Sequence, residues 1–592
     1  MGGGVPEIIA RLLESRGISA DGIDEFLSPS LRDLAPPCEL PNVDAAAEAI
    51  LAAVRGGRKV VIFGDYDCDG VCATAILVRT LSAFGADVSA FLPERLSEGY
   101  GMSEASVARM IKENPGVGLV VTVDNGINSV ENVAFLKEKG VDVVVTDHHL
   151  PGDTLPDCVV VNPKVSHPEI FENLCGAGVA FLLANELVTK ARGAGLYSGP
   201  SLAGPLLVLA GLATVTDVMP LLGQNRILVA EALNRFDSLA PVGLRSLFSK
   251  AARRGVVRHT SKDFGFLLGP RINAAGRIAS GAEALRLVLA NSQDEADEAA
   301  RIVNGRNDER KNVEQKMLEN ALAKIVPSAA AQVIDLPDGH QGVAGIVAAR
   351  VMERMDPKVP VCVVVGGHGS ARAPDGINVR DALAASGEFL NRFGGHAAAA
   401  GFSVKDGMVD AFRERFAEVC AGLSAEVSDE KRGDVVDAWV SPDDLTIELA
   451  EWITRLEPFG EGNPEPVFGL RGVTFADIRL MGENGKHAAF SFADRRIPRA
   501  TWWGHGEMAD RLRARSAERF DVTFTLDVSD WGGEEPHLEL RLCGVAAAVP
   551  GVYGVTDGPL AVEPPVVDGD ATFINGVGDI KLGIKAYSRS GN

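Results

Sequence analysis

Short apolar runs alternate with segments of helical spacing along the first third of the chain. The runs are rich in β-branched residues, as in "KVVIF" at 59–63 and "VDVVVTDHH" at 141–149, whereas "SVENVAFLKEKG" at 129–140 has the spacing of a helix. Continuous β-branched runs separated by helices are typical of a parallel sheet that is covered on both faces. The pattern therefore predicts an α/β domain in this part of the chain.

Three further patterns follow. After about residue 225 the spacing is largely helical, and the stretch 294–325 contains no proline and predicts one long helix that acts as a rigid spacer. The strand-like runs "AAQVIDL" and "VPVCVVVGG" then flank a helix-like segment and predict a second α/β unit over 330–422. Alternating apolar positions over 434–549 predict a small β-barrel.

At 592 residues the chain is too long for one hydrophobic core. We therefore predict an α/β fold class with two α/β domains joined by a long helix, plus a C-terminal β-barrel domain. The expected segments are an N-terminal leader packed on the first domain (1–42), the first α/β domain (43–225), a helical connector (226–329), the second α/β domain (330–425), the barrel (434–549) and a tail (550–592).

Charge and cysteine content narrow the possible functions. The net charge of −22 argues against broad non-specific binding of nucleic acid, although it is compatible with a narrow basic channel in an acidic body. Eight scattered cysteines without a CxxC pair favour reduced thiols in a cytoplasmic protein. The most apolar segment, 204–222, contains Asp217 and Pro220, so we interpret it as buried core and expect neither a signal peptide nor a membrane span.

Three aspartates, Asp65, Asp67 and Asp69, follow the first apolar strand in "GDYDCDG". Like charges this close repel and raise one another's pKa unless a cation lies among them. A solvated acidic turn is the simpler alternative. An EF-hand is excluded, because a strand precedes the motif and Ile76 stands where that loop needs a bidentate glutamate.

Further acids and histidines follow other predicted strands, as the three aspartates follow the first strand. Asp124 follows the strand in "VVTVDNG", and His148 and His149 follow the strand in "VVVTDHH". Because the carboxyl ends of parallel strands meet at one edge of the sheet, we expect these side chains to lie close together. Asp217 lies in an apolar helix, where burial of its charge is costly unless a cation pairs with it.

These side chains are too many ligands for one ion. Two divalent cations that share a bridging carboxylate would use them all, and such pairs serve phosphoryl-transfer hydrolysis. Carboxylate and imidazole ligands without thiolate suit Mn²⁺, with Mg²⁺ as the competitor. The predicted catalytic residues, all of them candidate metal ligands at this point, are Asp65, Asp67, Asp69, Asp124, His148, His149 and Asp217.

Seven short motifs follow one another along the chain: "GDYDCDG", "VTVDNGI", "VTDHH", "GLATVTDVMPL", "GPRINAAGR", "HQGVAGIVAAR" and "RFGGHAAAAG". In this order they resemble the RecJ family of single-strand-specific 5′→3′ DNA exonucleases, within the DHH phosphoesterase superfamily. The resemblance extends from about residue 40 to "LEPFGEGNPEPVF" at 456–468. It implies a DHH catalytic domain, a DHH-associated substrate-binding domain and an OB-fold-like nucleic-acid-binding domain. It also implies metal ligation by Asp65 or Asp67, Asp69, Asp124, His148 and Asp217, with His149 supporting the site.

Polar residues in Gly-rich turns are candidates for phosphate contact. An arginine can bind a terminal phosphate bidentately, and backbone amides with a hydroxyl and a guanidinium form an anion cradle. The resemblance implies that Arg95, Ser370 and Arg372 hold a 5′-phosphate. The other predicted substrate contacts are Tyr100, Arg271, Asn273, Arg277, His340 and His396. The residues alone leave open a surface arginine, a packed tyrosine and histidines that start helices or pack in the core.

The resulting hypothesis is a metal-dependent exonuclease that degrades single-stranded DNA 5′→3′, releases 5′-mononucleotides and acts in DNA repair and recombination. Helicase and single-strand-binding protein are partners that the resemblance implies, and we expect a monomer. In the barrel, Trp502, Trp503 and Trp531 could stack bases or fill the core, and we favour the core for at least one of them.

Two alternatives stay open. A DHH phosphoesterase acting on short oligonucleotides or cyclic dinucleotides would have the same chemistry, although the length of the chain and "LEPFGEGNPEP" count against it. A binding module built on an inactive nuclease scaffold is expected to lack metal acids, and every expected acid is present here.

Overall fold

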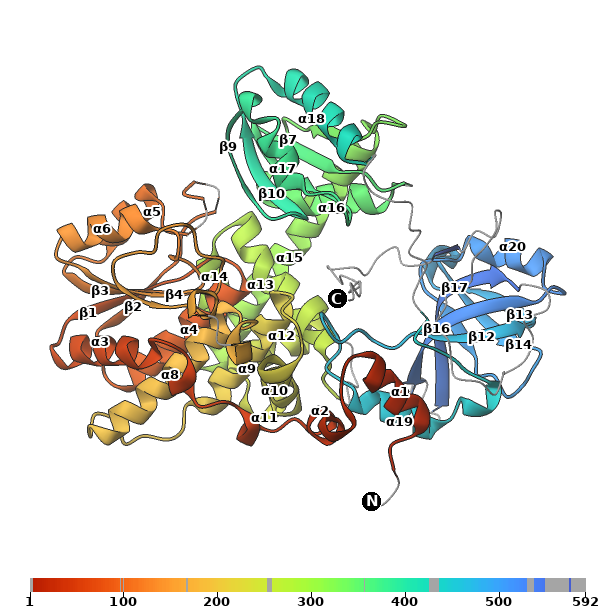
Figure 1. The fold of residues 1–592 in the computed structure, drawn as a ribbon, viewed down its shortest axis with the longest axis horizontal. Coiled ribbons are helices and arrows are strands. Elements are labelled where there is room, and N and C mark those ends of the chain that lie inside the picture. Colours follow the sequence, from red (N-terminus) through yellow and green to blue (C-terminus); the bar gives the residue numbers. More distant parts are fainter. Residues whose placement is uncertain are drawn as a thin grey trace. The chain divides into compact units, whose positions relative to one another are not determined.

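The computed structural model describes residues 4–95, 97–99, 101–166, 169–252, 258–355, 357–424, 436–529, 537–548 and 574–575 of the chain. Figure 1 shows its helices and strands as a ribbon. The contacts within the chain divide it into two compact units. One unit is Ser30–Ser428, and the other joins Met1–Pro29 to Asp429–Asn592.

The first unit begins with a five-stranded sheet in which every pairing is parallel, as the β-branched runs predict. The order β2-β1-β3-β4-β5 is built from β1 (Lys59–Phe63), β2 (Val88–Phe91), β3 (Val117–Thr122), β4 (Asp142–Thr146) and β5 (Val159–Val161). Alternate residues of β1 enter two separate cores, because successive side chains of a strand point to opposite faces. Both faces of the sheet are therefore buried.

Helices cover these two faces. The core that contains Val60 and Ile62 is shared with α3 (Val43–Arg55), α4 (Cys68–Ala83) and α8 (Gly176–Gly193). The core that contains Val61 and Phe63 is shared with α5 (Glu104–Glu113) and α6 (Val130–Glu138). The loops that follow β1, β3 and β4 consequently emerge at one edge of the sheet, between the two helical layers.

A helical region follows the sheet. Its helices are α9 (Ala203–Thr216), α10 (Gly223–Asn234), α11 (Phe236–Leu239), α12 (Val242–Ala251), a π-helical turn (Asp263–Leu268), α13 (Gly269–Ile278), α14 (Gly281–Leu289) and α15 (Gln293–Leu322). The apolar helix α9 is buried from Leu206 to Thr214, as predicted. Within the described part of the chain, none of the helices has the length and apolar character needed to cross a membrane.

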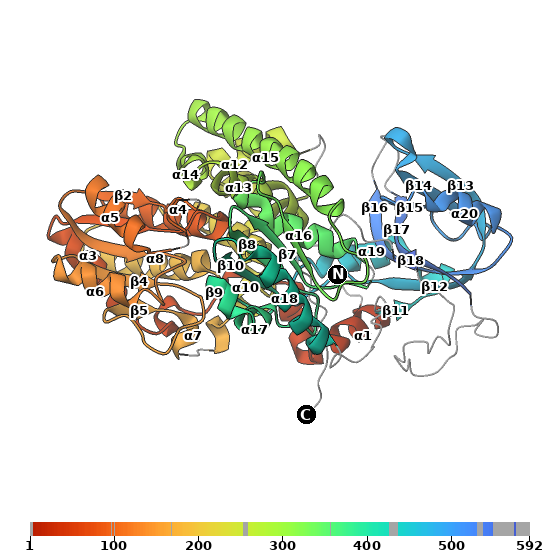
Figure 2. The ribbon, with the colours of Figure 1, turned by 90° about the horizontal axis from the view of Figure 1, so that it is seen from above.

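The predicted long helix is confirmed as α15, which has 30 residues (Figure 2). It begins after Ser292, whose hydroxyl accepts a hydrogen bond from the backbone N–H of Glu295 and so caps the first turn. Residues Met317, Leu318 and Ala321 near its end pack in the core of the second α/β domain.

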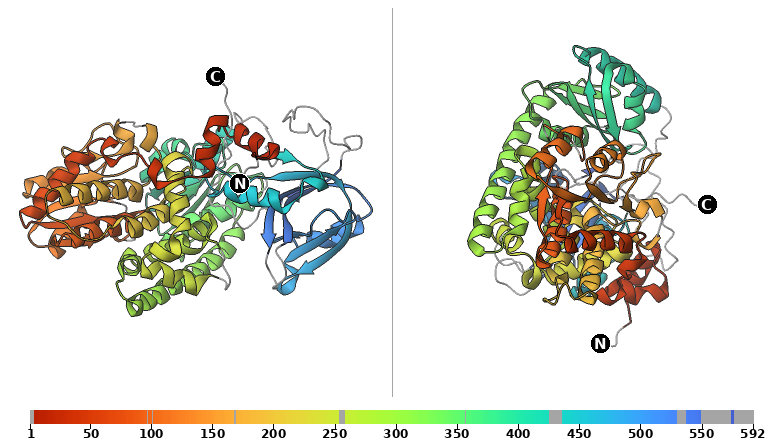
Figure 3. Two further views of the ribbon diagram at one scale, coloured as in Figure 1. Left: turned by 90° about the horizontal axis from the view of Figure 1, so that it is seen from below. Right: turned by 90° about the vertical axis from the view of Figure 1, so that its left-hand side faces the viewer.

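The second α/β domain contains a mixed sheet in the order β6-β7-β8-β10-β9. Its strands are β6 (Gln332–Asp335), β7 (Val361–Val365), β8 (His368–Arg372), β9 (Leu390–Gly395) and β10 (Ala399–Val404). Only β6 and β7 pair in parallel. α16 (Ala344–Glu353) packs on one face, and α17 (Val379–Ala384) and α18 (Val409–Ser424) lie by the other, so this sheet is also covered on both sides (Figure 3).

The second unit is built on a sheet of eight strands. Seven follow the order β11-β12-β16-β17-β15-β14-β13, and β18 (Ile574–Asn575) pairs with β17. The seven are β11 (Ala438–Trp439), β12 (Phe468–Val473), β13 (Phe475–Met481), β14 (His487–Phe492), β15 (Ala500–Trp502), β16 (Phe520–Ser529) and β17 (His537–Ala547). The helices α19 (Ile447–Arg455) and α20 (Met508–Ala514) accompany the sheet.

The N-terminal segment does not lie on the first domain along its whole length, so this prediction was wrong for its first part. The apolar faces of α1 (Glu7–Ser15) and α2 (Ile23–Leu27) are buried in the core of the barrel unit, whereas Ala35 and Leu40 pack in the first unit. A short helix with one apolar face has no hydrophobic core of its own and buries that face wherever the fold leaves apolar surface open.

Two of the three barrel tryptophans lie among the described residues. Trp502 is fully buried and Trp503 is 51% exposed, which confirms that at least one tryptophan belongs to the core. Trp531 lies outside the described residues.

Candidate metal centre and anion site

The turn after β1 places three aspartates at the start of α4. Asp67 caps this helix, because its Oδ1 atom accepts hydrogen bonds from the backbone N–H groups of Asp69 (3.0 Å) and Gly70 (3.1 Å). Asp65 is buried beside it, and neither of its carboxylate oxygens accepts a hydrogen bond from the described residues. A Cβ atom at Gly70 would lie 2.5 Å from the backbone nitrogen of Asp65, so only glycine permits this close approach.

Asp69 is anchored by a helix that begins more than a hundred residues later. Its Oδ2 and Oδ1 atoms accept hydrogen bonds from the backbone N–H groups of Gly176 and Ala177, each at 2.7 Å, at the start of α8. A helix N-terminus carries unpaired N–H groups and favours a negative charge, so α8 holds this carboxylate in place.

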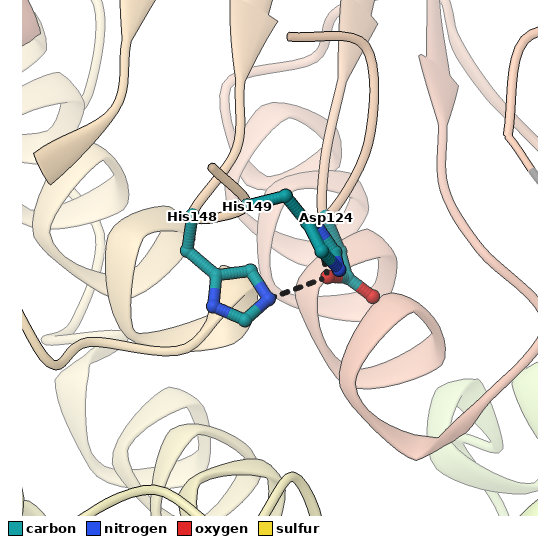
Figure 4. A group of neighbouring side chains, drawn as sticks. All are labelled: Asp124, His148 and His149. Carbon is teal, nitrogen blue, oxygen red and sulfur yellow. Dashed lines mark hydrogen bonds and ion pairs between the residues drawn. The ribbon is translucent and has the colours of Figure 1, made fainter. Parts of the chain in front are cut away.

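His148 lies at the centre of the acidic group. Its Nε2 atom is 3.1 Å from Oδ1 of Asp124, 3.6 Å from Oδ2 of Asp69 and 3.7 Å from Oδ2 of Asp217. Figure 4 shows the imidazole of His148 directed at the carboxylate of Asp124. Burial lowers the pKa of His148 to about 4, so the ring is neutral at physiological pH and has a lone pair to offer a metal ion.

The buried carboxylates carry more negative charge than the described protein groups neutralise. Burial raises the pKa values of Asp65, Asp124 and Asp217 well above their ordinary value, and neighbouring aspartates raise them further. The Oδ2 atom of Asp217 is buried without a hydrogen-bond partner in the described structure, like both oxygens of Asp65. Buried acceptors of this kind fit a bound cation, which would satisfy them and remove the cost of their charge.

The structure brings all seven predicted metal and catalytic residues into three overlapping groups. In each group the potential ligand atoms lie within 4.8 Å of one another. The groups are Asp65 with Asp67 and Asp124, Asp69 with His148 and Asp217, and Asp124 with His148 and His149. The first two groups share no residue, so the side chains can hold two ions, and oxygen and imidazole donors fit Mn²⁺ and Mg²⁺.

Asp147 is a site residue that the sequence-based set omits. Its Oδ1 atom is 2.8 Å from Nδ1 of His149 and accepts the backbone N–H of His148 at 2.7 Å, while Oδ2 accepts the N–H of Ile127 at 2.9 Å. Burial by itself raises the pKa of Asp147, but the hydrogen bond and charge of His149 outweigh it and lower that pKa. Asp147 therefore fixes the orientation of His149, as acids behind histidine ligands commonly do.

Three arginines form a second group. Burial, followed by the charges of Arg95 and Arg372, lowers the pKa of Arg277 to about 9. The guanidinium of Arg95 lies 5.2 Å from the ring centroid of Tyr66, which stands between Asp65 and Asp67 in the sequence. Among the described residues, none of the three arginines forms an ion pair with a carboxylate. Guanidinium groups whose charges act on one another, and which form no ion pair in the described structure, fit an anion with several oxygens, such as a phosphate.

Comparisons with known proteins cover most of the chain. A model of the DHH family, N-terminal domain, matches residues 59–207, a DHHA1 domain model matches 327–422, and a RecJ OB domain model matches 436–542. The single-stranded-DNA-specific exonuclease RecJ of Thermus thermophilus is 36% identical over 541 residues, which are 90% of this chain and 76% of that relative. The chain belongs to the RecJ family.

Further RecJ sequences and structures are also similar to this chain. RecJ of Escherichia coli is 35% identical over 506 residues, which are 81% of this chain and 85% of that relative. A crystal structure of Thermus thermophilus RecJ in complex with Mn²⁺ has a TM-score of 0.77 at 33% identity and covers 91% of this chain and 75% of that one. The structure of the same RecJ with Mg²⁺ has a TM-score of 0.72 at 32% identity and covers 91% of this chain and 74% of that one.

The remaining predicted substrate-binding residues of this RecJ-family chain differ in their hydrogen bonds and in their burial. Arg271 donates to Oδ1 of Asn304 at 2.9 Å, and Oδ1 of Asn273 accepts the backbone N–H of Cys68 at 2.7 Å, so both are bound within the protein. Asn273 thereby supports the first acidic motif. The residues His340 and Ser370 are half-buried, His396 is exposed after β9, and Tyr100 lies outside the described residues.

Proposed function

We propose that this chain is a metal-dependent exonuclease that hydrolyses single-stranded DNA from the 5′ end and releases 5′-mononucleotides, in DNA repair and recombination. The proposal is supported by relatives of this chain that are named single-stranded-DNA-specific exonucleases. The observation that carries it is the pairing of a buried group of carboxylates and histidines with a group of arginines that have no carboxylate partner in the described structure.

In this proposal Asp65, Asp67, Asp69, Asp124, His148 and Asp217 hold two divalent ions, with Mn²⁺ preferred and Mg²⁺ as the competitor. Two crystal structures of Thermus thermophilus RecJ, one with Mn²⁺ and one with Mg²⁺, support these two ions as candidates. Ions held there supply the acidity that activates a water molecule and the positive charge that a phosphodiester needs as it is cleaved. Asp69 contributes a fixed carboxylate because α8 anchors it, and Asp147 keeps His149 in one orientation.

The arginine group holds the terminal phosphate. Arg95, Ser370 and Arg372 bind the 5′-phosphate, and Arg277 adds a third guanidinium whose pKa, lowered by burial to about 9, still leaves it charged at neutral pH. A terminal phosphate held here sets the register of the strand, so that the next phosphodiester meets the acidic centre. The other substrate contacts, Tyr100, Arg271, Asn273, His340 and His396, stay predictions.

The test compares substrates with the full chain and Mn²⁺. A single strand labelled at its 5′ end should release labelled mononucleotide at once, whereas a 3′-labelled strand should shorten one nucleotide at a time. Blunt duplex DNA should resist. Rapid hydrolysis of cyclic or linear dinucleotides without degradation of long strands would instead support the alternative of a short-oligonucleotide phosphoesterase. Helicase and single-strand-binding protein as partners, the monomeric state and a cytoplasmic location stay predictions.

A further inference from the structure

The loop after β2 carries Arg95, and an ion pair fastens this loop to α5. The Nε and Nη2 atoms of Arg109, on α5, donate to Oε1 and Oε2 of Glu98 at 2.7 and 2.8 Å. The side chain of Glu98 is only 8% exposed, and that of Arg109 is 29% exposed. A bidentate pair with this burial is geometrically defined, unlike most ion pairs at a protein surface.

The same guanidinium holds both ends of the loop. Nη2 of Arg109 also donates to the backbone carbonyl of Leu92 at 2.9 Å, directly after β2. Oε2 of Glu98 accepts the backbone N–H of Glu94 at 2.8 Å, and the N–H of Glu98 donates to the carbonyl of Glu94 at 2.8 Å. Arg95 directly follows Glu94, whose N–H and carbonyl groups are both bound by Glu98.

The position of Arg95 depends on the turn. Its guanidinium forms no ion pair within the described structure and contacts the ring of Tyr66 from 5.2 Å. A long side chain without its own anionic partner has many conformations, and a fixed backbone removes part of that freedom before a ligand arrives.

We infer that Glu98 and Arg109 are positioning residues that hold the Arg95 loop ready to bind the 5′-phosphate. The inference rests on the proposed function, because it assigns Arg95 to the terminal phosphate. Lysine at position 109 would keep the charge but could not donate to both Glu98 oxygens and the Leu92 carbonyl in one plane, so the geometry demands arginine.

A purely structural role of the ion pair makes a different prediction. Loss of a structural pair lowers the activity on every substrate alike, or lowers the melting temperature alone. Loss of a positioning pair changes the discrimination between a 5′-phosphate and a 5′-hydroxyl, because only the phosphate uses Arg95. Glu113 supplies a matched control, since it also binds Arg109, at 3.2 and 3.3 Å, but from α5 itself and outside the loop.

The experiment measures kcat/KM of the full chain with Mn²⁺ on one single-stranded oligonucleotide that carries either a 5′-phosphate or a 5′-hydroxyl. Glu98→Gln and Arg109→Lys should each reduce the ratio of the two values about tenfold, through the phosphorylated substrate. Glu113→Gln should leave the ratio unchanged. Glu98→Gln added to Arg95→Ala should cause no further loss, because both act through the same guanidinium.

Two results would overturn the inference, and they are distinguishable. If Arg95→Ala reduces the ratio while Glu98→Gln and Arg109→Lys do not, the ion pair does not position Arg95, and the proposed function stands. If Arg95→Ala itself leaves the ratio unchanged, the assignment of Arg95 to the phosphate fails and the positioning role fails with it.

Discussion

The Nε2 atom of His148 lies 3.1 Å from Oδ1 of Asp124, although the two residues follow different strands of the parallel sheet. β3 and β4 are neighbours in this sheet, and both strands end at the same edge. The adjacency brings a neutral imidazole and a buried carboxylate together at a place where water is largely excluded. A cation that binds there meets both ligands without a rearrangement of the backbone.

Asp124→Asn should abolish most of the hydrolysis. The amide keeps the shape of the side chain but removes its charge. Asp124 belongs both to the group with Asp65 and Asp67 and to the group with the two histidines, so the turnover should fall by roughly a thousandfold or more. The melting temperature of the metal-free protein should be kept or raised, because burial raises the pKa of Asp124 and disfavours its charge. Turnover of labelled single strands is the measurement.

Asp153→Asn is the matched control, since Asp153 is exposed on the loop after the two histidines. It should leave turnover unchanged. Near-normal turnover in Asp124→Asn would remove this residue from the metal centre.

Arg372→Ala should weaken the preference for 5′-phosphorylated ends. Arg372 is on β8, and burial lowers its pKa, with the charge of Arg95 as the second cause. Its guanidinium donates to the backbone carbonyl of Ala371 at 2.8 Å, a neutral acceptor, so an anion would add a stronger, charge-assisted hydrogen bond. Competition between phosphorylated and unphosphorylated strands measures the preference, and Arg380→Ala, at an exposed arginine of α17, is the control. An unchanged preference would disconnect Arg372 from the recognition of the strand end.

Mn²⁺ should raise the melting temperature, and by more at pH 8 than at pH 5. The pKa values of Asp65, Asp124 and Asp217 are raised by burial, so these groups stabilise the metal-free fold at low pH and lose that contribution as the pH rises through their folded-state pKa values. Protons therefore compete with the metal more strongly at pH 5 than at pH 8. Binding to the folded state alone stabilises it in proportion to the logarithm of the ligand excess.

Burial lowers the pKa of His148 to about 4, so this ring stays neutral at both pH values and adds no proton competition with the metal. Thermal melts with Mn²⁺ or with EDTA at the two pH values measure the difference. A shift that is equal at both values would mean that the buried carboxylates are not the metal ligands.

Binding of single-stranded DNA should weaken steeply with salt, in spite of the net charge of −22. Each phosphate neutralised by a fixed cation releases counterions and adds roughly 0.7 to the slope of log K against log salt for a single strand. Arg277→Gln should therefore reduce the slope by about that amount. Fluorescence anisotropy of the metal-free protein gives the slope, and a flat response would contradict binding through phosphates.

Val218→Gly should stabilise the protein. Val218 has a φ of 56°, in the left-handed region, directly after Asp217 ends α9. The backbone N–H of Met219 bonds to the carbonyl of Thr214 at 3.1 Å, which is the helix ending that normally uses glycine. A β-branched residue is strained there, so glycine should raise the free energy of unfolding by about 1 kcal/mol in a denaturant titration. Val218→Ala, which keeps a Cβ atom, should recover less, and a glycine variant of lower stability would refute the strain.

Much of the fold follows from local pattern. The strands of the parallel sheet and the buried helix α9 are apolar runs that differ in length and in their content of β-branched residues, and the long helix α15 has helical charge spacing without a proline. The seven predicted metal and catalytic residues were proposed because strand ends in a parallel sheet share one edge, and because Asp217 is a charge next to an apolar helix.

The parts that sequence reasoning missed depend on contacts between distant residues. Asn273 supports the first acidic motif through Cys68, 205 positions away, and nothing in "GPRINAAGR" indicates that contact. α1 shows its apolar face in the sequence, but the choice between the first domain and the barrel unit is a competition between two surfaces that exist only after folding.

Periodicity and charge by themselves determined where the strands and helices lie and which acids and histidines reach one edge of the sheet, because those properties depend on neighbours a few residues apart. Tertiary structure alone decided which carboxylates are fixed and which are left without a partner: α8 supplies N–H groups to Asp69, Asp147 orients His149, and Oδ2 of Asp217 has no hydrogen-bond partner among the described residues. Burial and hydrogen bonding across long separations set those differences, and no local pattern of residues carries them.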